Sequence, residues 1–450
     1  MARLFGTDGV RGTANKELTP ELAYHMGRAA AAYFGARKER PVFLIGRDTR
    51  RSGPMLESAL AAGINAVGGD VVLAGVIPTP AVSHLVKKHG YDAGVVISAS
   101  HNPFEDNGIK FFDNQGFKLP DAVEDEMESL IEQSKNGTLP RSIGKEVGRQ
   151  FQREGLRYEY VDFICSTVQE NLEGIRIIYD GANGAAYQVA PEVFSRLGAV
   201  TLATHVLPDG VNINKNCGST HLEGLQAAVV ANRADIGIAN DGDADRCLMV
   251  DEEGNVLDGD QIMLLCALHL KEQGKLKKDT IVSTVMSNIG FHKAAKEMGM
   301  KTINTAVGDR YVLEKMREED YSIGGEQSGH VIFLDYNATG DGLLTAVQTL
   351  AILKSSGKKL SELAALMTKY PQLLVNVRVA TKEGWEENRA IQEAIAKGNE
   401  ELGDSGRILV RSSGTEALIR VMAEGQDQEQ LNRICHAIAD VVLQEQGKAE

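Results

Sequence analysis

Residues 235–246 read Asp-Ile-Gly-Ile-Ala-Asn-Asp-Gly-Asp-Ala-Asp-Arg, a short apolar run that leads into a polar loop with aspartates at alternate positions. Apolar runs of this length, bounded by Gly, Asn and Asp, are typical of buried strands. Two other apolar runs, residues 92–97 and 321–323, also end in polar loops. Those loops read Ser-Ala-Ser-His-Asn-Pro over residues 98–103 and Gly-Gly-Glu-Gln-Ser-Gly-His over residues 324–330. The recurrence indicates a repeated structural unit.

Each loop closes a longer unit in which apolar strand-like runs alternate with helical stretches. The first strands are residues 42–45, 175–179 and 281–285, the helices are 54–67, 188–197 and 291–298, and the second strands are 70–73, 200–206 and 301–306. Alternating strands and helices predict α/β domains with mixed, largely parallel sheets. Ligands of open parallel sheets bind beyond the carboxyl ends of the strands, so the three polar loops are expected to line one central cleft.

The segment after residue 370 has a different pattern. Strands are expected at 373–379, 407–410 and 417–422, with helices at 385–397 and 427–444, and Leu431, Ile434, Ile438 and Val441 form a helical apolar stripe. This predicts a smaller C-terminal α+β domain. The predicted domains are residues 1–150, 151–255, 256–369 and 370–450. An acidic helix over 121–133 is expected to present a solvated charged face.

Composition excludes several classes of protein. The 450 residues include 62 acidic and 48 basic side chains, a net charge of −14, whereas nucleic-acid binding needs a dense basic face. The five cysteines are scattered and odd in number, which indicates a reduced protein without a disulfide framework or zinc site. Apolar runs are too short to span a bilayer, and the first residues lack the apolar stretch of a signal peptide. A cytoplasmic protein is expected.

The aspartates of the first-quoted loop are candidate metal ligands. In extended backbone, Asp241, Asp243 and Asp245 project to one side, and three carboxylates suit Mg²⁺ or Ca²⁺. An EF-hand loop is one alternative, since Glu252 falls at its twelfth position. However, Arg246 stands where that loop needs glycine, and the flanks are predicted strands. A polar turn without metal is the other alternative.

Ser100 and His101 offer a hydroxyl beside an imidazole. The Gly-x-Ser-x-Gly signature of hydrolases is missing, because the neighbours of Ser100 are Ala99 and His101. A serine near a cation and Lys110 could instead carry a phosphoryl group. The alternatives are a serine and histidine that stabilise a turn, and a surface lysine.

Other polar segments contain groups that suit phosphates and sugar hydroxyls. Residues 411–415, Arg-Ser-Ser-Gly-Thr, combine an arginine, hydroxyls and a glycine, which suits a phosphate or an ordinary turn. Arg11, in a glycine-spaced loop, and Arg310, at a predicted helix start, could each bind an anion. Glu326, Ser328 and His330 could bind hydroxyls, although His330 could equally be structural. P-loop and dinucleotide signatures are missing from the sequence.

Together these segments resemble the α-D-phosphohexomutase superfamily over the whole chain. The resemblance depends on Gly-Thr-Asp-Gly-Val-Arg-Gly at residues 6–12 and on residues 98–103, 241–246, 325–330 and 411–416, in that order. The sequences of residues 6–12 and 325–330, with Val-Gly-Asp-Arg at 307–310, are similar to those of the bacterial branch that acts on glucosamine phosphate. The chain departs from the common pattern at Ser412 and Ala417, where related loops often carry proline.

The resemblance implies roles for individual residues. Ser100 would carry the catalytic phosphoryl group and, with Asp241, Asp243 and Asp245, bind one Mg²⁺ per chain. Glu326 and Ser328 would hold sugar hydroxyls. The residues implied around the reacting phosphate are Arg11, His101, Lys110, Arg246 and His330, and those implied around the non-reacting phosphate are Arg411, Ser413, Gly414 and Thr415.

The expected reaction is the interconversion of glucosamine 6-phosphate and glucosamine 1-phosphate through a phosphoserine and a 1,6-bisphosphate. This reaction feeds the synthesis of UDP-N-acetylglucosamine and cell-wall precursors, with glucosamine or glucose 1,6-bisphosphate as activator. A mutase for mannose or glucose phosphate, a metal-dependent phosphatase and a sugar-phosphate-binding protein without turnover are the alternatives. The expected partner is a small phosphorylated amino sugar, without nucleic acid or membrane. A homodimer is compatible with the sequence, which leaves the oligomeric state open.

Overall fold

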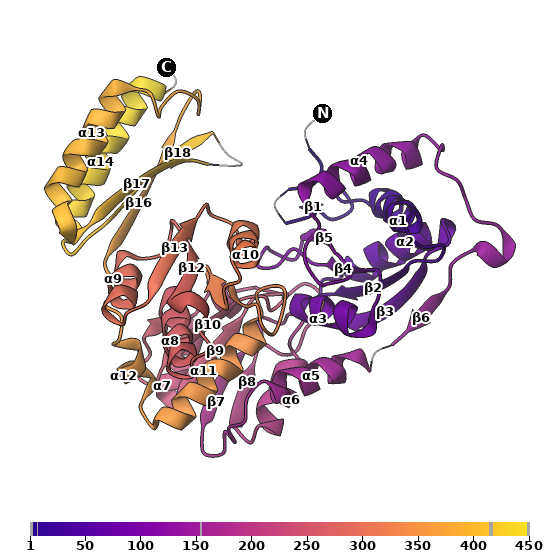
Figure 1. Cartoon of the computed structure of the whole chain (residues 1–450), viewed down its shortest axis with the longest axis horizontal. Coiled ribbons are helices and arrows are strands. Elements are labelled where there is room, and N and C mark those ends of the chain that lie inside the picture. Colours follow the sequence, from indigo (N-terminus) through magenta and orange to yellow (C-terminus); the bar gives the residue numbers. More distant parts are fainter. Residues whose placement is uncertain (1–2, 7, 154, 414–416, 448–450) are drawn as a thin grey trace. The chain divides into compact units, whose positions relative to one another are not determined.

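The structure is a computed structural model, and it describes residues 3–6, 8–153, 155–413 and 417–447. The chain forms two compact units, which are described separately. The first comprises Met1–Met286 and Met300–Leu366, and the second comprises Ser287–Gly299 and Met367–Glu450. Figure 1 colours the elements by their order along the chain.

Three sheets of the first unit share one strand order. In each, a central strand pairs in parallel with two others, and a fourth strand runs antiparallel beside one of these. The orders are β3-β2-β4-β5, β8-β7-β9-β10 and β13-β12-β14-β15. The strands are β2 (Val42–Arg47), β3 (Asp70–Val76), β4 (Ala93–Ile97), β5 (Asp106–Phe112), β7 (Arg176–Asp180), β8 (Val200–Thr204), β9 (Ile236–Asn240), β10 (Cys247–Asp251), β12 (Thr280–Thr284), β13 (Lys301–Thr305), β14 (Ile323–Gly325) and β15 (Val331–Phe333).

The repeat expected from the sequence is therefore confirmed, with additional strands. The antiparallel strands β5 and β15 were not predicted, because β5 contains a buried lysine and asparagine that hide its apolar pattern. Further edge strands extend two of the sheets, namely β1 (Val10–Thr13) beside β5, β6 (Gln150–Gln152) beside β3, and β11 (Val256–Leu257) beside β10. The sheets are mixed and largely parallel, as expected.

Helices connect and cover these strands (Figure 1). They are α1 (Pro20–Gly35), α2 (Gly53–Ala66), α3 (Thr79–His89), α4 (Asp121–Lys135), α5 (Leu156–Ser166), α6 (Val189–Arg196), α7 (Glu223–Asn232), α8 (Gly259–Glu272), α10 (Asp309–Glu318), α11 (Gly342–Ser356) and α12 (Leu360–Ala364). Short 3₁₀ turns lie at Gly144–Glu146, Gly218–Thr220, Lys277–Asp279 and Gly403–Ser405. Helix α11 is buried on almost every side and packs on α5, α8, β9 and β10, which joins the second and third domains.

Local sequence explains several helix boundaries and contacts. The side chain of Thr19 accepts a hydrogen bond from the amide of Leu22 at the start of α1, and Asp258 with Gln261 forms a capping box on α8. Helices α1 and α2 approach closely at Gly63, where a Cβ atom would collide with the carbonyl of Tyr24. Within the described residues, no helix is long and apolar enough to cross a membrane.

The second unit is a small α+β domain. Its antiparallel sheet has the order β16-β18-β17, and two long helices pack beside each other on it (Figure 1). The elements are β16 (Gln372–Arg378), β17 (Arg407–Ser412), β18 (Leu418–Glu424), α9 (Ile289–Glu297), α13 (Arg389–Leu402) and α14 (Gln428–Gln446). Helix α13 begins at Arg389, later than predicted, because the Asn388 side chain caps it. On α14, Val442 is fully buried, whereas Val441 is only half-buried.

These elements confirm the predicted architecture of three related α/β domains and a smaller α+β domain. The exact boundaries at residues 150, 255 and 369 stay predictions.

Candidate active site

The loops that follow β4, β9 and β14 come together around one cavity of about 640 Å³. All three α/β domains contribute to its wall. The sequence-predicted residues that line it are Arg11, His101, Asp245, Arg246, Glu326, Ser328 and His330. Ser100, Lys110, Asp241 and Asp243 are buried beneath that wall. The polar loops of the three domains thus share one site within the first unit.

Ser100 lies at the start of the first of these loops in a left-handed backbone conformation, with φ of 52°. This conformation is uncommon for residues other than glycine. The hydroxyl of Ser100 donates a hydrogen bond of 2.5 Å to Oδ2 of Asp241 in the second domain. His101 Nδ1 lies 3.4 Å from the same hydroxyl. The backbone therefore presents the Ser100 side chain to the aspartate loop.

The three aspartates converge as predicted, although the loop that carries them is a turn, with Ala244 at φ of 58°, and not the extended backbone that was expected. Oxygen atoms of Asp241, Asp243 and Asp245 lie within 4.8 Å of one another, and all three residues are buried. Burial and the two neighbouring carboxylates raise the pKa of Asp241 well above its usual value. Among the described residues, Oδ1 of Asp243 and Oδ1 of Asp245 have no hydrogen-bond partner. Unpartnered buried carboxylate oxygens in a like-charged cluster fit a hard divalent cation.

Strands β9 and β10 pair antiparallel on either side of this aspartate loop, so it is not an EF-hand. The Glu252 carboxylate accepts hydrogen bonds from Ser361, away from the aspartates.

Basic residues surround the aspartate cluster. Nζ of Lys110 lies 3.1 Å from Asp243 and 2.9 Å from Asp8, and although burial opposes its charge, these carboxylates raise its pKa. Arg11 pairs with the same Asp8. Nε of Arg11 and Nε of Arg246 are buried without a hydrogen-bond partner among the described residues. Such donors suit the oxygens of a phosphoryl group.

The two candidate histidines differ in their surroundings. Burial, together with Arg246 and Arg11, lowers the pKa of His101 to about 4. Burial would also lower the pKa of His330, but Asp245 at 3.5 Å and Asp309 at 3.6 Å raise it to about 8. These surroundings favour the neutral form of the His101 imidazole and favour a proton on the His330 imidazole, whose Nε2 also accepts a hydrogen bond of 3.1 Å from the amide of Gly340.

The third domain supplies the remaining wall of the cavity. Glu326 accepts a hydrogen bond of 3.1 Å from the amide of Gly308, and burial raises its pKa. Ser328 is exposed within the cavity. Carboxylate and hydroxyl groups at this position suit the hydroxyls of a sugar ring.

Arg310 is not among the residues that line the cavity. Its guanidinium donates to the Asp121 carboxylate and to the carbonyl of Leu119, on and just before α4. Arg3 also pairs with Asp121, at 2.9 Å, and with Glu124, at 3.2 Å. The acidic face of α4 was expected to be solvated, but these two arginines contact its first turn.

The predicted phosphate loop belongs to the second unit. Ser413 is buried, and its carbonyl accepts a hydrogen bond of 2.7 Å from Lys382. Arg411 lies opposite Arg420 in the strand pair β17–β18, and burial and Arg420 lower the pKa of Arg411. Two arginines at facing positions favour an anion nearby. Gly414 and Thr415 lie outside the described residues.

Several residues of the site were missed from the sequence. Nζ of Lys118 lies 2.5 Å from Asp8 and 2.6 Å from Asp309, so a half-buried lysine joins the first and third domains at the cavity wall. Lys118, Asp8 and Asp309 share no sequence pattern, so the sequence did not indicate that they interact. Asp8 and Asp309 do stand within the motifs quoted for Arg11 and Arg310. Thr79, whose hydroxyl donates to Asp243 over 2.7 Å, was also missed.

Comparison with known proteins identifies the family. Models of the phosphoglucomutase/phosphomannomutase family match as α/β/α domain I at residues 2–138, domain II at 158–254, domain III at 258–370 and the C-terminal domain at 374–441. A phosphoglucosamine mutase of Caldicellulosiruptor saccharolyticus is 55% identical over 98% of this chain and 99% of its own. The chain belongs to the phosphoglucomutase/phosphomannomutase family. The superfamily predicted from its five segments is therefore confirmed.

Other relatives agree with this membership. Proteins named phosphoglucosamine mutase are 53% identical in Clostridium novyi, over 98% of this chain and 99% of the relative, and 54% identical in Symbiobacterium thermophilum, over 99% and 100%. A family protein of solved structure from Burkholderia thailandensis superimposes with a TM-score of 0.83 at 25% identity, covering 98% of this chain and 97% of that one.

A more distant structure has the same fold. The N-acetylphosphoglucosamine mutase of Aspergillus fumigatus, solved with GlcNAc-6P and magnesium, has a TM-score of 0.68 at 19% identity. The comparison covers 98% of this chain and 95% of the fungal one.

Proposed function

We propose that this protein is a phosphoglucosamine mutase, which interconverts glucosamine 6-phosphate and glucosamine 1-phosphate. The observation that carries the proposal is the Ser100 hydroxyl, 2.5 Å from Asp241 and at the edge of a buried cluster of three aspartates. Relatives with 51–55% identity over nearly the whole chain carry that name. The expected substrate is accordingly a small phosphorylated amino sugar, as the sequence predicted.

In this proposal Ser100 carries the phosphoryl group. The bond from phosphorus to the serine oxygen breaks as a bond forms to the free hydroxyl of the bound sugar phosphate, whose proton passes to a basic residue of the cavity. The resulting 1,6-bisphosphate then returns its other phosphoryl group to Ser100. Arg11, His101, Lys110, Arg246 and His330 are the residues among which the base and the acid are to be sought.

Asp241, Asp243, Asp245 and an oxygen of phosphorylated Ser100 would hold one Mg²⁺. When bound, the ion supplies positive charge that stabilises the transferring phosphoryl group. Lys110 adds a fixed positive charge from below the cavity, and the unpartnered Nε atoms of Arg11 and Arg246 are available to phosphoryl oxygens.

The substrate is expected to be held at both ends. Glu326 and Ser328 would bind the sugar hydroxyls at the cavity wall, and Arg411 and Ser413, with Gly414 and Thr415, would bind the non-reacting phosphate. Arg310 contacts Asp121 of α4 in this structure, so its part in substrate binding stays a prediction. We further propose a cytoplasmic location, domain boundaries at residues 150, 255 and 369, and activation by glucosamine or glucose 1,6-bisphosphate.

The test compares the full-length protein with S100A. The parent should gain the mass of one phosphoryl group after incubation with the bisphosphate and should convert glucosamine 6-phosphate to the 1-phosphate, whereas S100A should do neither while keeping its fold. Conversion by S100A at the parent rate would overturn the proposal.

The same assay separates the alternatives. Stoichiometric release of inorganic phosphate would indicate a phosphatase, and absence of both turnover and phosphoserine would indicate a binding protein. Faster turnover of mannose or glucose phosphate than of glucosamine phosphate would assign a sibling mutase.

A further inference from the structure

A fully buried arginine holds the loop that begins at Ser100. Arg50 follows β2, and its side chain has no exposed surface. The guanidinium has five N–H donors, and the structure gives it five acceptors. These are Oδ2 of Asp48 at 2.9 Å and the carbonyls of Ser100 at 3.0 Å, Asn102 at 2.8 Å, Asp106 at 3.1 Å and Pro103. Four of the five therefore belong to the segment from residue 100 to residue 106.

The carboxylate of Asp48 extends this network to the amide of Ser100. Oδ2 of Asp48 accepts a hydrogen bond of 2.5 Å from the hydroxyl of Ser98. That hydroxyl in turn accepts a hydrogen bond of 3.0 Å from the Ser100 amide. Both main-chain polar groups of Ser100 are thus bound within one buried network, which accounts for its left-handed backbone conformation.

The second domain holds the same carbonyls from the other side. Nδ2 of Asn214 donates to the carbonyl of Ser100 over 2.8 Å and to that of Asn102 over 3.0 Å. The Ser100 carbonyl therefore lies between the guanidinium of Arg50 and the amide of Asn214. Its position is fixed from two domains at once.

We propose that Arg50, with Asp48 and Ser98, positions the Ser100 hydroxyl for phosphoryl transfer. The inference rests on the proposed role of Ser100 as phosphoryl carrier. Arg50 does not line the cavity, so it acts through the loop and is a positioning residue. A buried ion pair is costly to desolvate and is a poor source of stability alone. Misplacement of a reacting group by 1 Å can slow a reaction about 100-fold. The Arg50–Asp48 pair would therefore be useful because it keeps Ser100 in place, and not because it stabilises the fold.

The test replaces Arg50 with lysine, which keeps the charge but loses the planar fork. In R50K we expect kcat to fall about 30-fold or more, with KM for glucosamine 6-phosphate changed by less than about threefold, because substrate binding groups are untouched. Phosphoryl transfer from isolated phosphoenzyme to the sugar phosphate should slow equally, and the ³¹P resonance of phosphoserine should shift.

Arg28 provides a matched control. It is also almost fully buried, and it donates to the carbonyls of Leu139 at 2.7 Å, Pro140 at 3.2 Å and Ser134 at 3.4 Å, away from the cavity. R28K should lower the melting temperature as R50K does, but leave kcat and the ³¹P resonance at parent values. Equal loss of kcat in both variants would assign Arg50 a merely structural role and overturn the inference.

If R50K does not fold, S98A tests whether the network of Arg50, Asp48 and Ser98 positions Ser100. It removes the hydroxyl between Asp48 and the Ser100 amide with little change in volume, and kcat should fall about tenfold. Parent kcat in S98A, or in folded R50K, would overturn the inference. These outcomes differ from a failure of the proposed function. If the proposed function is wrong, the parent protein itself will lack phosphoserine or mutase activity.

Discussion

The Ser100 hydroxyl donates a hydrogen bond of 2.5 Å to Oδ2 of Asp241, although the two residues belong to different domains and lie 141 positions apart in the chain. The contact brings the candidate phosphoryl carrier to the candidate metal ligands. It also means that the packing of the first domain on the second decides whether the site exists.

Replacing Asp241 with asparagine should raise the stability of the metal-free protein. Burial, with Asp245 and Asp243, makes a negative charge on Asp241 unfavourable in the metal-free protein, and asparagine cannot carry that charge. In EDTA, D241N should therefore melt above the parent. Saturating MgCl₂ should stabilise the parent, by about 2.7 kcal/mol at 100 times Kd, but not D241N.

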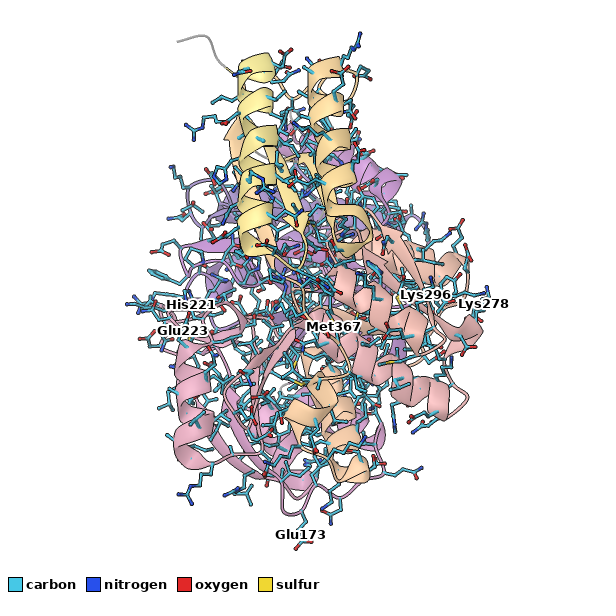
Figure 2. All side chains as sticks on the ribbon, turned by 90° about the vertical axis from the view of Figure 1, so that its left-hand side faces the viewer. Glu173, His221, Glu223, Lys278, Lys296 and Met367 are labelled. Atoms are coloured by element: carbon cyan, nitrogen blue, oxygen red, sulfur yellow. The ribbon has the colours of Figure 1, made fainter. Side chains whose placement is uncertain are left out.

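The control for this prediction is E223Q, because Glu223 is an exposed acid of the same domain (Figure 2). Thermal melting with and without metal checks the three proteins. A parent that Mg²⁺ does not stabilise would contradict the assignment of the aspartate cluster.

Replacing Lys118 with methionine should destabilise the first unit strongly. Nζ of Lys118 lies 2.5 Å from Asp8 and 2.6 Å from Asp309, and its loss leaves these two half-buried carboxylates without the lysine that bridges them, although Asp8 keeps Lys110 and Arg11. A cost of about 1–3 kcal/mol is expected from the urea midpoint. K135M removes the exposed pair with Glu132 and should change stability by less than about 0.5 kcal/mol. Similar midpoints for both variants would contradict the prediction.

Replacing Gly242 with alanine should slow turnover more than it lowers stability. A Cβ atom there would lie 2.5 Å from the carbonyl oxygen of Ser100 and 2.9 Å from Nδ2 of Asn214, so the Ser100 loop must shift. A loss of kcat of about tenfold or more is expected. G224A is the control, since a Cβ atom at Gly224 meets nothing within 4 Å. Parent kcat in G242A would show that the loop tolerates the shift.

The stability of the protein should fall in mild acid through His84. Its ring stacks on Phe163 at 3.7 Å, and burial, with Lys88 and Lys87, lowers its pKa from 6.5 to about 4. Between pH 6.5 and pH 4, His84 therefore binds a proton in the unfolded chain but not in the folded protein. The contribution of neutral His84 to the free energy of unfolding is complete above pH 6.5 and is lost as pH falls toward 4. The loss is at most about 3 kcal/mol.

In H84Q the decrease of melting temperature between pH 7 and pH 5 should be smaller than in the parent. H221Q should match the parent, because His221 projects into solvent (Figure 2). An unchanged pH profile in H84Q would assign the acid sensitivity to other groups.

Periodicity along the chain was sufficient to predict the repeated domains. The strands of residues 42–47, 176–180 and 280–284 are short, apolar and bounded by turn residues, so local composition identifies them. Strand β5 was not predicted because it contains Lys110 and Asn107, two polar residues that are buried by contacts with other parts of the fold. Its first three residues, Asp-Asn-Gly, resemble a turn.

Motifs within one loop could likewise be assigned to a site. Asp241, Asp243 and Asp245 alternate over five residues, and short-range geometry keeps them together. Arg310 shows the limit of such reasoning, because its place at a helix start suggested an anion, whereas its guanidinium contacts Asp121 of another domain.

The sequence by itself therefore determined the repeated alternation of strands and helices, the three polar loops and the aspartate cluster, because all of these depend on neighbours within a few residues. Tertiary structure alone decided that Ser100 meets Asp241, that Lys118 joins Asp8 to Asp309, and that Arg50 holds the loop after Ser100. These contacts join residues 50 to 191 positions apart. Each contact gives a polar or charged group its partner from a distant segment of the chain, which only the tertiary fold can bring within hydrogen-bond distance.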